Sequence, residues 1–405
     1  MTLYNVDKCE DQGFVIGIDA TNLRGGGGTV THLIEILRAA NRRDHNIASL
    51  ILWGNIEILS KIEDMDWLVK INPHLSEGNL FQRSYWQHFC LSRAARDLGC
   101  DMLFAPGGTY TGDFHPIVTM SRNMLPFEWN ELRRFGWSLM TFKFLLLRWT
   151  QIRTFRKADG VIFLTRYAKV AVESATNEIQ GSVSVIGHGI SNRFNIIPRR
   201  QKAITEFSKA NPLRILYVST INQYKHQWQV INAIGILRAT QGWPLVLDLV
   251  GAANYQPAMD RLKASMRYHD PKGEWVLYHG SVSYNQLHSY YANADIGVFA
   301  SSCENLPNIL LETMASGLPV ACSNRGPMPE ILGEDGLYFD PEDAFDIANC
   351  LAVLIDQPSL RDELAHRSHS RSLDFTWEKC AFQTFQFLIE TLLQYRSAKR
   401  NIRNI

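Results

Sequence analysis

Short apolar runs alternate with amphipathic helical patterns along most of this chain. In the first half, mostly apolar runs typical of buried parallel strands occur at 14–20, 50–53, 101–104, 116–120, 160–164 and 183–186. Between them, segments such as 30–40 and 82–98 repeat apolar residues with helical spacing. Strand, helix and strand in succession build a parallel sheet that helices cover on both faces. The first half therefore predicts a doubly wound α/β domain.

The same alternation starts again after a polar stretch at 191–212, which contains two prolines and is typical of a linker. Further strand-like runs follow at 214–219, 245–250, 275–279, 295–299 and 318–322. A last amphipathic segment, 376–395, has no strand after it and predicts a helix that packs back on the first domain. We therefore expect two Rossmann-like domains, at 1–192 and 193–375, and a final helix within 376–405. Two such sheets in series bind ligands in the cleft between the carboxyl ends of their strands.

Composition and charge exclude several functional classes. The 405 residues carry a net charge of only +1, so nothing global indicates binding to nucleic acid. No apolar run approaches the length of a membrane-spanning helix, and the first residues include acids where a signal peptide would be basic. The seven cysteines show no C-x-x-C pair, which favours reduced thiols and argues against a zinc site. We expect a cytoplasmic protein.

The most informative segment is 301–319, SSCENLPNILLETMASGLP, which directly follows the predicted strand at 295–299. Pro307 suits the first turn of a helix, and Gly317 suits its end. The first backbone N–H groups of this helix would face the cleft and favour an anion. Glu304 precedes the helix and can reach a sugar hydroxyl, whereas Glu312 lies inside it and can accept hydrogen bonds from a ribose diol.

These residues carry a family resemblance. Glu304 and Glu312 are separated by seven residues, and Met-Ala-Ser-Gly-Leu-Pro-Val follows at 314–320. This pattern resembles the signature of glycosyltransferase family 4, whose members have the GT-B fold of two Rossmann-like domains facing across a cleft. Flanking segments at 248–251 and 278–282 are similar to those of the family in the same order. The resemblance is strong in the second half of the chain and weak in the first.

The resemblance implies transfer of a sugar from a nucleoside diphosphate donor, with retention at the anomeric carbon and without a metal. It assigns Glu304 to the sugar, Glu312 to the ribose and the backbone near Val282 to the base. Donor-binding positions would also include the residues that surround the start of the predicted helix, Leu306, Pro307 and Asn308.

Phosphate binding departs from the family pattern. Members carry an Arg and a Lys after the first strand of the second domain, and this chain keeps Lys225 but has Thr220 at the Arg position. We expect Lys225 to act in catalysis with Glu304 by binding the donor diphosphate. Thr220 can donate a hydrogen bond but supplies no charge, so a second cation, such as Arg24 or Arg325, would have to come from elsewhere.

The first domain offers a glycine-rich loop, 24–29, which follows the first strand and opens a helix. Its glycines let the backbone approach a phosphate, so Gly27 and Gly28 are predicted donor contacts. A flexible surface turn is the alternative.

Where the family often has a His-Asp pair after the strand at 116–120, this chain has Arg122 and Asn123. We assign Asn123 to the catalytic site, lining the sugar position. For His32, His188 and His226 a structural role is favoured.

Two charged segments allow competing interpretations. Segment 132–158 carries seven cations interleaved with aromatic residues and is typical either of an element on an anionic membrane surface or of a core helix with a basic exposed face. Asp64 and Asp66 spell Asp-x-Asp, a metal motif of another glycosyltransferase architecture. No strand is predicted before them, so we interpret the pair as a solvated turn and expect no metal site.

The sequence thus predicts a retaining, metal-independent hexosyltransferase without a cofactor. Its donor would be GDP-mannose or a UDP-sugar, and its acceptor a saccharide, lipid-linked in surface polysaccharide or lipopolysaccharide assembly. Such an enzyme would be cytoplasmic or peripheral at the inner face of the cell membrane. Two alternatives remain open: a nucleotide-sugar epimerase of the same fold, and a nucleotide-binding protein whose catalytic site has decayed.

Overall fold

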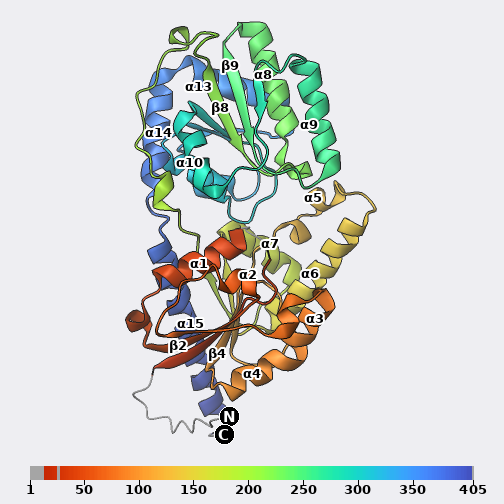
Figure 1. Ribbon diagram of the computed structural model, residues 1–405, viewed down its shortest axis with the longest axis vertical. Coiled ribbons are helices and arrows are strands. Elements are labelled where there is room, and N and C mark those ends of the chain that lie inside the picture. The colour runs from red at the N-terminus through yellow and green to blue at the C-terminus, as the bar shows by residue number, and fades with distance from the viewer. Residues whose placement is uncertain (1–12, 25–27, 404–405) are drawn as a thin grey trace.

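The chain folds into two parallel-sheet domains stacked along its long axis (Figure 1). The computed structural model describes residues 13–24 and 28–403. The first domain, red to yellow-green in the lower part of the view, leads into the second, green to blue, and the last helix returns to the first domain. This arrangement confirms the fold class predicted from the alternation of strands and helices.

Within the described residues, the first sheet has seven parallel strands in the order β3-β2-β1-β4-β5-β6-β7. The strands are β1 (Phe14–Asp19), β2 (Ile47–Trp53), β3 (Leu68–Ile71), β4 (Met102–Ala105), β5 (Ile117–Met120), β6 (Gly160–Phe163) and β7 (Ser182–Val185). The helices of this domain are α1 (Gly28–Ala39), α2 (Ile56–Leu59), α3 (Leu80–Tyr85), α4 (Leu91–Asp97), α5 (Trp129–Arg133), α6 (Leu139–Lys157) and α7 (Arg166–Thr176). Every residue of β4, β5 and β6 is buried, which explains why these strands are continuous apolar runs.

The second sheet has six parallel strands in the described chain, in the order β10-β9-β8-β11-β12-β13. They are β8 (Leu213–Val218), β9 (Leu245–Val250), β10 (Val276–Tyr278), β11 (Ile296–Phe299), β12 (Val320–Ser323) and β13 (Leu337–Phe339). The remaining helices are α8 (Gln227–Gln241), α9 (Gln256–His269), α10 (Tyr284–Asn293), α11 (Asn308–Ala315), α12 (Met328–Leu332), α13 (Ala344–Asp356), α14 (Pro358–Ser372) and α15 (Trp377–Arg403).

Three elements differ from the sequence-based prediction. The strands β3 and β13 were not predicted, and both lie at sheet edges; Lys70 interrupts the apolar run of β3, and β13 has only three residues. The single helix predicted at 82–98 is two helices, α3 and α4, because a π-helical segment at Trp86–Cys90 joins them. A π-helical turn contains about one residue more than an α-helical turn, so the exposed face of the helix rotates at that point.

The strand order decides where a ligand can bind. In each sheet the first strand of the domain, β1 or β8, lies between strands that are reached by connections running in opposite directions. Loops therefore diverge at the carboxyl ends of β1 and β8, which opens a site in such sheets. The chain after β1 leads to α1, and the chain after β8 leads to Lys225, so both predicted phosphate-binding segments lie at these points.

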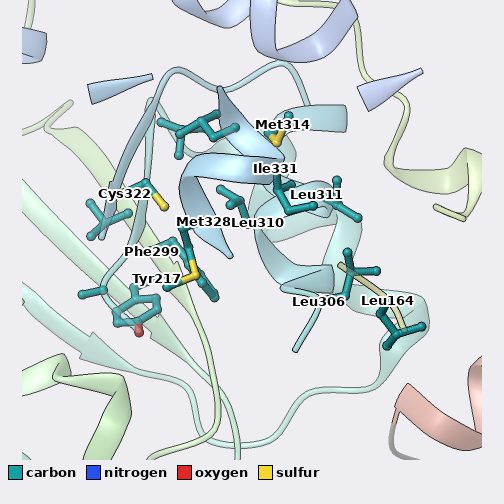
Figure 2. Packing of buried hydrophobic residues seen from close by; sticks show 14 of the residues in the cluster. Leu164, Tyr217, Phe299, Leu306, Leu310, Leu311, Met314, Cys322, Met328 and Ile331 are labelled. Carbon is teal, nitrogen blue, oxygen red and sulfur yellow. The ribbon is translucent and has the colours of Figure 1, made fainter. Parts of the chain in front are cut away.

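The helix α11 is anchored by α12 and by the chain that enters the second domain. Leu310, Leu311 and Met314 belong to one buried cluster with Met328 and Ile331 of α12 (Figure 2). At its end Gly317 has φ +65°, and a Cβ atom there would lie 2.6 Å from the carbonyl oxygen of Ile196. Only glycine fits this position, which confirms Gly317 as the end of the helix.

The last helix, α15, packs against the first domain. Its residue Gln394 accepts a hydrogen bond from the Ser182 hydroxyl in β7 (2.6 Å), and Arg396 pairs with Asp101 (2.5 Å). The helix crosses from the second domain to the far end of the first (Figure 1). It therefore ties the two domains together along one side.

Candidate active site

Two helices begin on opposite sides of the interface between the domains, and their first residues meet. α1 begins at Gly28 and α11 begins at Asn308. A Cβ atom on Gly28 would lie only 3.4 Å from the side-chain nitrogen of Asn308. Neither helix has an acidic residue in its first turn, and no side chain caps α11. Both positive helix ends are thus available to an anion between the domains. Gly27, the other predicted contact, lies outside the described residues.

Lys225 and Glu304 form an ion pair at the carboxyl edge of the second sheet. Lys225 ends a short 3-10 turn after β8, and Glu304 lies in the loop between β11 and α11. The backbone N–H of Ser302 donates to the carbonyl of Tyr224 (2.8 Å), and the Tyr217 hydroxyl donates to the carbonyl of Lys225 (2.7 Å). These bonds hold the two loops together at the edge of the sheet, and the loops in turn position Lys225 and Glu304.

The surroundings of this pair are mostly buried and partly aromatic. The Lys225 and Glu304 side chains are only 7% and 16% exposed. The Lys225 Nζ atom lies 5.2 Å from the ring centre of Tyr224 and 5.5 Å from that of Phe299, at cation–π distance. An ammonium group has three N–H donors, so Lys225 can hold Glu304 and a phosphate oxygen at the same time.

Glu312 lies in α11 with its carboxylate buried. The hydroxyl of Tyr291 donates to Oε2 (3.2 Å), and that of Tyr284 lies 3.5 Å from Oε1. Burial raises the pKa of Glu312 to about 7, although both hydroxyls and the nearby charge of Arg193 oppose the shift. At neutral pH this carboxyl group therefore titrates, and a ligand that donates hydrogen bonds to it favours the ionised form.

The other predicted donor contacts fall into two groups. Pro307 is the N-cap residue of α11, and the Asn308 side-chain oxygen lies 3.1 Å from Nδ1 of His188 in the first domain. Leu306 is buried in the same cluster as Leu164 of the first domain, and Figure 2 shows the two side chains close together. All three residues therefore lie where the domains meet.

Val282 and Thr220 are placed differently. Val282 is partly buried and packs on the cluster that contains Leu287, next to the second sheet. Thr220 is exposed, and its carbonyl oxygen accepts a hydrogen bond from Gln227 (2.9 Å). Phosphate binding by the Thr220 hydroxyl group stays a prediction.

Arg122 and the histidines build the support beneath α1. Arg122 donates from Nε to the Thr29 hydroxyl and from Nη2 to the Gly28 carbonyl, both at 3.1 Å. Burial lowers the pKa of Arg122 to about 10. The rings of His32 and His188 stack at 4.5 Å, and burial together with the charge of Arg122 lowers the pKa of both. Arg122 thus fixes the start of α1.

Asn123 and His226 shape their own loops. The side-chain oxygen of Asn123 accepts the backbone N–H of Leu125 (3.1 Å), so its catalytic role stays a prediction. His226 has φ +49°, its Nε2 atom lies 2.9 Å from the Ser302 hydroxyl, and burial lowers its pKa to about 4. It holds the loop that carries Lys225.

The candidate second cations are engaged elsewhere. Arg325 pairs with Asp340 at 2.7 Å. The guanidinium group of Arg24 donates to the carbonyls of Thr21 (3.0 Å) and Leu23 (2.7 Å) in its own loop. Each cation therefore already has a partner, and a role as second phosphate ligand stays a prediction for both.

Asp64 and Asp66, the Asp-x-Asp pair, lie at the surface. Asp64 pairs with Lys70 at 2.6 Å, and Asp66 pairs with Arg42 at 3.4 Å. Each carboxylate thus has its own cation, as expected for solvated side chains.

Several contacts between the domains were missed by the sequence analysis. The Asn305 side chain donates to the Ser121 carbonyl (3.1 Å), and the Thr165 hydroxyl donates to the Asn305 carbonyl (3.0 Å). The Glu330 carboxylate accepts the first two backbone N–H groups of α7, at 2.8 and 2.9 Å. An acid such as Glu330 can be expected at the start of a helix, because it suits the positive helix end. Nothing in the sequence shows that this helix lies in the other domain.

Comparisons with known proteins agree with this geometry. Residues 175–371 match the family model of the glycosyl transferases group 1. O-antigen chain mannosyltransferase B of Escherichia coli is 29% identical over 171 residues, which are 42% of this chain and 44% of the relative. Sulfoquinovosyl transferase SQD2 of Arabidopsis thaliana is 26% identical over 200 residues, 46% of this chain and 36% of the relative. The chain thus spans less than half the length of these curated relatives.

Solved structures cover nearly the whole chain. Sucrose-phosphate synthase from Thermosynechococcus elongatus has a TM-score of 0.71 at 18% identity, over 94% of this chain and 100% of the other. Anabaena Alr3699/HepE in complex with UDP-glucose has a TM-score of 0.67 at 15% identity, with 94% and 100% covered. At these identities the likeness shows the fold, which is GT-B.

Proposed function

From a chain of GT-B fold whose residues 175–371 match the group 1 glycosyl transferases, we propose a retaining glycosyltransferase of family 4. It moves a sugar from a nucleoside diphosphate sugar to a saccharide acceptor. The observation that carries the proposal is the Lys225–Glu304 pair beside the facing starts of α1 and α11. A cation and two helix N-termini suit a diphosphate, and a carboxylate beside them suits sugar hydroxyls.

The proposed reaction takes place on one face of the sugar. The bond between the anomeric carbon and the diphosphate oxygen breaks, and the acceptor oxygen forms the new bond from the same side. The acceptor proton passes to the leaving diphosphate. Lys225 and the two helix ends stabilise the charge that the diphosphate gains. Glu304 holds sugar hydroxyls, Glu312 the ribose, and the backbone near Val282 the base.

The donor and acceptor follow from the relatives by analogy. A mannosyltransferase of O-antigen assembly supports GDP-mannose as donor and a lipid-linked saccharide as acceptor, with a UDP-sugar as the other candidate. The test is turnover of GDP-mannose and UDP-glucose with short mannosides in excess EDTA, with the anomer identified by NMR. An α-linked product from these α-linked donors, formed without metal, supports the proposal. Epimerised sugar nucleotide, or a nucleotide-dependent rise in melting temperature without turnover, would favour the two alternatives.

Glu312 gives this proposal a pH signature. Its pKa in the folded protein, about 7, lies above the ordinary value of 4.5. Between these values the folded state keeps a proton that the unfolded chain has lost, so the free energy of unfolding falls as pH rises through this window. A ribose diol donates to the ionised carboxylate and lowers its pKa. Affinity for a nucleoside diphosphate should therefore rise between about pH 6 and 8.

Calorimetry with GDP and UDP across this range measures the effect. Glu312→Gln is the matched control, because it keeps the size of the side chain but cannot ionise. The phosphate of the ligand also titrates near pH 6, and its contribution is the same in both proteins. The variant should bind about 5- to 100-fold more weakly at pH 8, since a hydrogen bond to a charged group is lost. Equal affinities and equal pH profiles in the two proteins would contradict the ribose role.

The basic segment 132–158 supports a membrane surface as partner. Its main helix, α6, buries Phe144 and Phe155 but leaves Phe142, Leu146 and Trp149 exposed at 68%, 52% and 59%. None of the described helices is long and apolar enough to cross a bilayer. We therefore propose contact with an anionic surface, with aromatic side chains at the interface and cations beside phosphate groups.

Vesicle binding checks this proposal. Lys143, Arg153 and Lys157 are exposed on α6, whereas Arg148 donates to a carbonyl and stacks on aromatic rings of its own domain. Neutralising the three exposed cations should weaken binding to anionic vesicles roughly 100-fold at low salt, at about 1 kcal/mol for each charge.

Three exposed lysines of the second domain, Lys209, Lys263 and Lys272, provide the control, because their neutralisation changes the net charge equally. Co-sedimentation with vesicles of anionic and of neutral lipid compares the two variants with the unaltered protein. If the unaltered protein does not sediment with anionic vesicles, the membrane contact is wrong and soluble acceptors are favoured.

A further inference from the structure

Glu128 is a carboxylate between the domains that the proposed reaction does not use. It follows the buried turn Leu125–Phe127 and takes the N-cap position of α5. The Glu128 side chain makes no capping hydrogen bond to this helix. Instead, its Oε1 atom accepts a short hydrogen bond from the hydroxyl of Tyr167, in the first turn of α7. The fold thus turns this carboxylate away from its own helix.

The surroundings place Glu128 near the Lys225–Glu304 pair. Cys303, which precedes Glu304, is buried in the same cluster as Phe127, and Tyr167 packs against that cluster. The Tyr167 ring also lies beside Gly326 of the second domain, 3.9 Å from the position that a Cβ atom there would take. The charges of Glu304 and Glu128 both add to the rise in the pKa of the Cys303 thiol caused by burial. Glu131 of the first domain acts in the same direction, so carboxylates of both domains lie around Cys303.

Glu128 also lacks the cationic partner that its neighbour Glu131 has. Glu131 pairs with Arg134 at 2.8 Å, whereas Glu128 has no ion pair within the described residues. Burial raises the pKa of Glu128, and the charge of Glu131 adds to the rise. A partly buried carboxylate with one neutral donor is costly unless a ligand supplies further hydrogen bonds. Such a ligand must donate hydrogen bonds without bringing negative charge.

We propose that Glu128 binds a hydroxyl group of the saccharide acceptor, and that Tyr167 positions the carboxylate. This inference rests on the proposed function and deepens it. The donor groups Lys225, Glu304 and Glu312 all belong to the second domain, whereas Glu128 belongs to the first, so an acceptor held by Glu128 would approach the donor from the first domain. A neutral sugar suits the site, because an acidic sugar would be repelled by the carboxylate. Glu128 thus favours acceptors whose terminal sugar is a neutral hexose.

Steady-state kinetics with methyl α-mannoside and α-mannobiose as acceptors test the inference. Glu128→Gln keeps the size of the side chain and an acceptor for the Tyr167 hydroxyl but removes the charge. It should raise the acceptor KM roughly 10- to 100-fold. Donor hydrolysis without acceptor and calorimetric affinity for GDP or UDP should stay unchanged. The matched control is Glu178→Gln, an exposed glutamate of the same domain, which should leave every value unchanged.

Tyr167→Phe separates positioning from structure. The variant removes the hydrogen bond that stabilises the ionised carboxylate, so the pH profile of kcat/KM for the acceptor should shift to higher pH. Its acceptor KM should rise roughly threefold to tenfold at neutral pH, with kcat and the melting temperature retained. A purely structural role of Tyr167 predicts a lower melting temperature without a shifted profile.

The outcomes are distinguishable. An acceptor KM within twofold of the unaltered protein in Glu128→Gln, or an equal loss of donor affinity, overturns the Glu128 assignment alone. If Glu128→Gln melts earlier, Glu128→Asp, which keeps the charge, should restore the acceptor KM in part. No restoration would also overturn the assignment. Absence of turnover by the unaltered protein with every donor and acceptor would overturn the proposed function, and the Glu128 assignment with it.

Discussion

Lys225→Ala is expected to lower kcat/KM for sugar transfer about 10²- to 10³-fold. Lys225 lies in the loop after β8 and pairs with Glu304, whereas Arg24 donates to backbone carbonyls and Arg325 pairs with Asp340. A preorganised positive group facing a leaving diphosphate typically contributes this much to the rate. Nucleoside diphosphate affinity should fall as well, because Lys225 contacts the phosphates in the ground state. Initial rates and calorimetry measure the two effects.

The control for this experiment is Lys263→Ala, which removes an exposed lysine from the same domain. Removing Lys225 also leaves the Glu304 carboxylate without its partner in a mostly buried site, which lowers stability. The double variant Lys225→Ala with Glu304→Ala removes that unpaired charge, so its melting temperature should exceed that of Lys225→Ala. Rates within threefold of the unaltered protein would show that the diphosphate is bound elsewhere.

Glu304→Gln is expected to lower kcat about 10²-fold, equivalent to about 2.7 kcal/mol of transition-state stabilisation. The loop after β11 brings Glu304 to Lys225, ahead of α11, where the sugar of the donor would lie. The carboxylate accepts hydrogen bonds from sugar hydroxyls, which strengthen as positive charge develops on the sugar. Affinity for a nucleoside diphosphate, which has no sugar there, should change less than threefold.

Glu334→Gln serves as the control, because it neutralises a glutamate of the same domain outside the site. Equal losses of kcat and nucleotide affinity in Glu304→Gln would instead assign Glu304 to the phosphate site or to the support of Lys225. Comparing transfer and donor hydrolysis separates a role in holding the sugar, which affects both, from a role in the acceptor site.

The sequence showed the second domain more fully than the first. Central strands such as β9 and β11 are mostly apolar because every residue in them is buried, and Gly317 is readable because only glycine fits a positive φ against a neighbouring carbonyl. The spacing between Glu304 and Glu312 places both residues relative to one helix, so local geometry was enough to predict their positions. The edge strand β3 was missed because Lys70 breaks its apolar pattern, and β13 because a run of three residues is too short to show one.

Only the tertiary structure decided which groups from distant segments meet. The Lys225–Glu304 pair, the contact between Gly28 and Asn308, and the two hydroxyls on Glu312 depend on how loops of separate strands converge. The same holds for Arg122, which stands where the family often has its His-Asp pair and which the structure shows bonded to the start of α1. Local sequence determines which strands and helices form, because propensity and burial act over a few residues. Distances between loops follow from strand order and domain packing, which join residues far apart in the chain and leave no periodic signal in it.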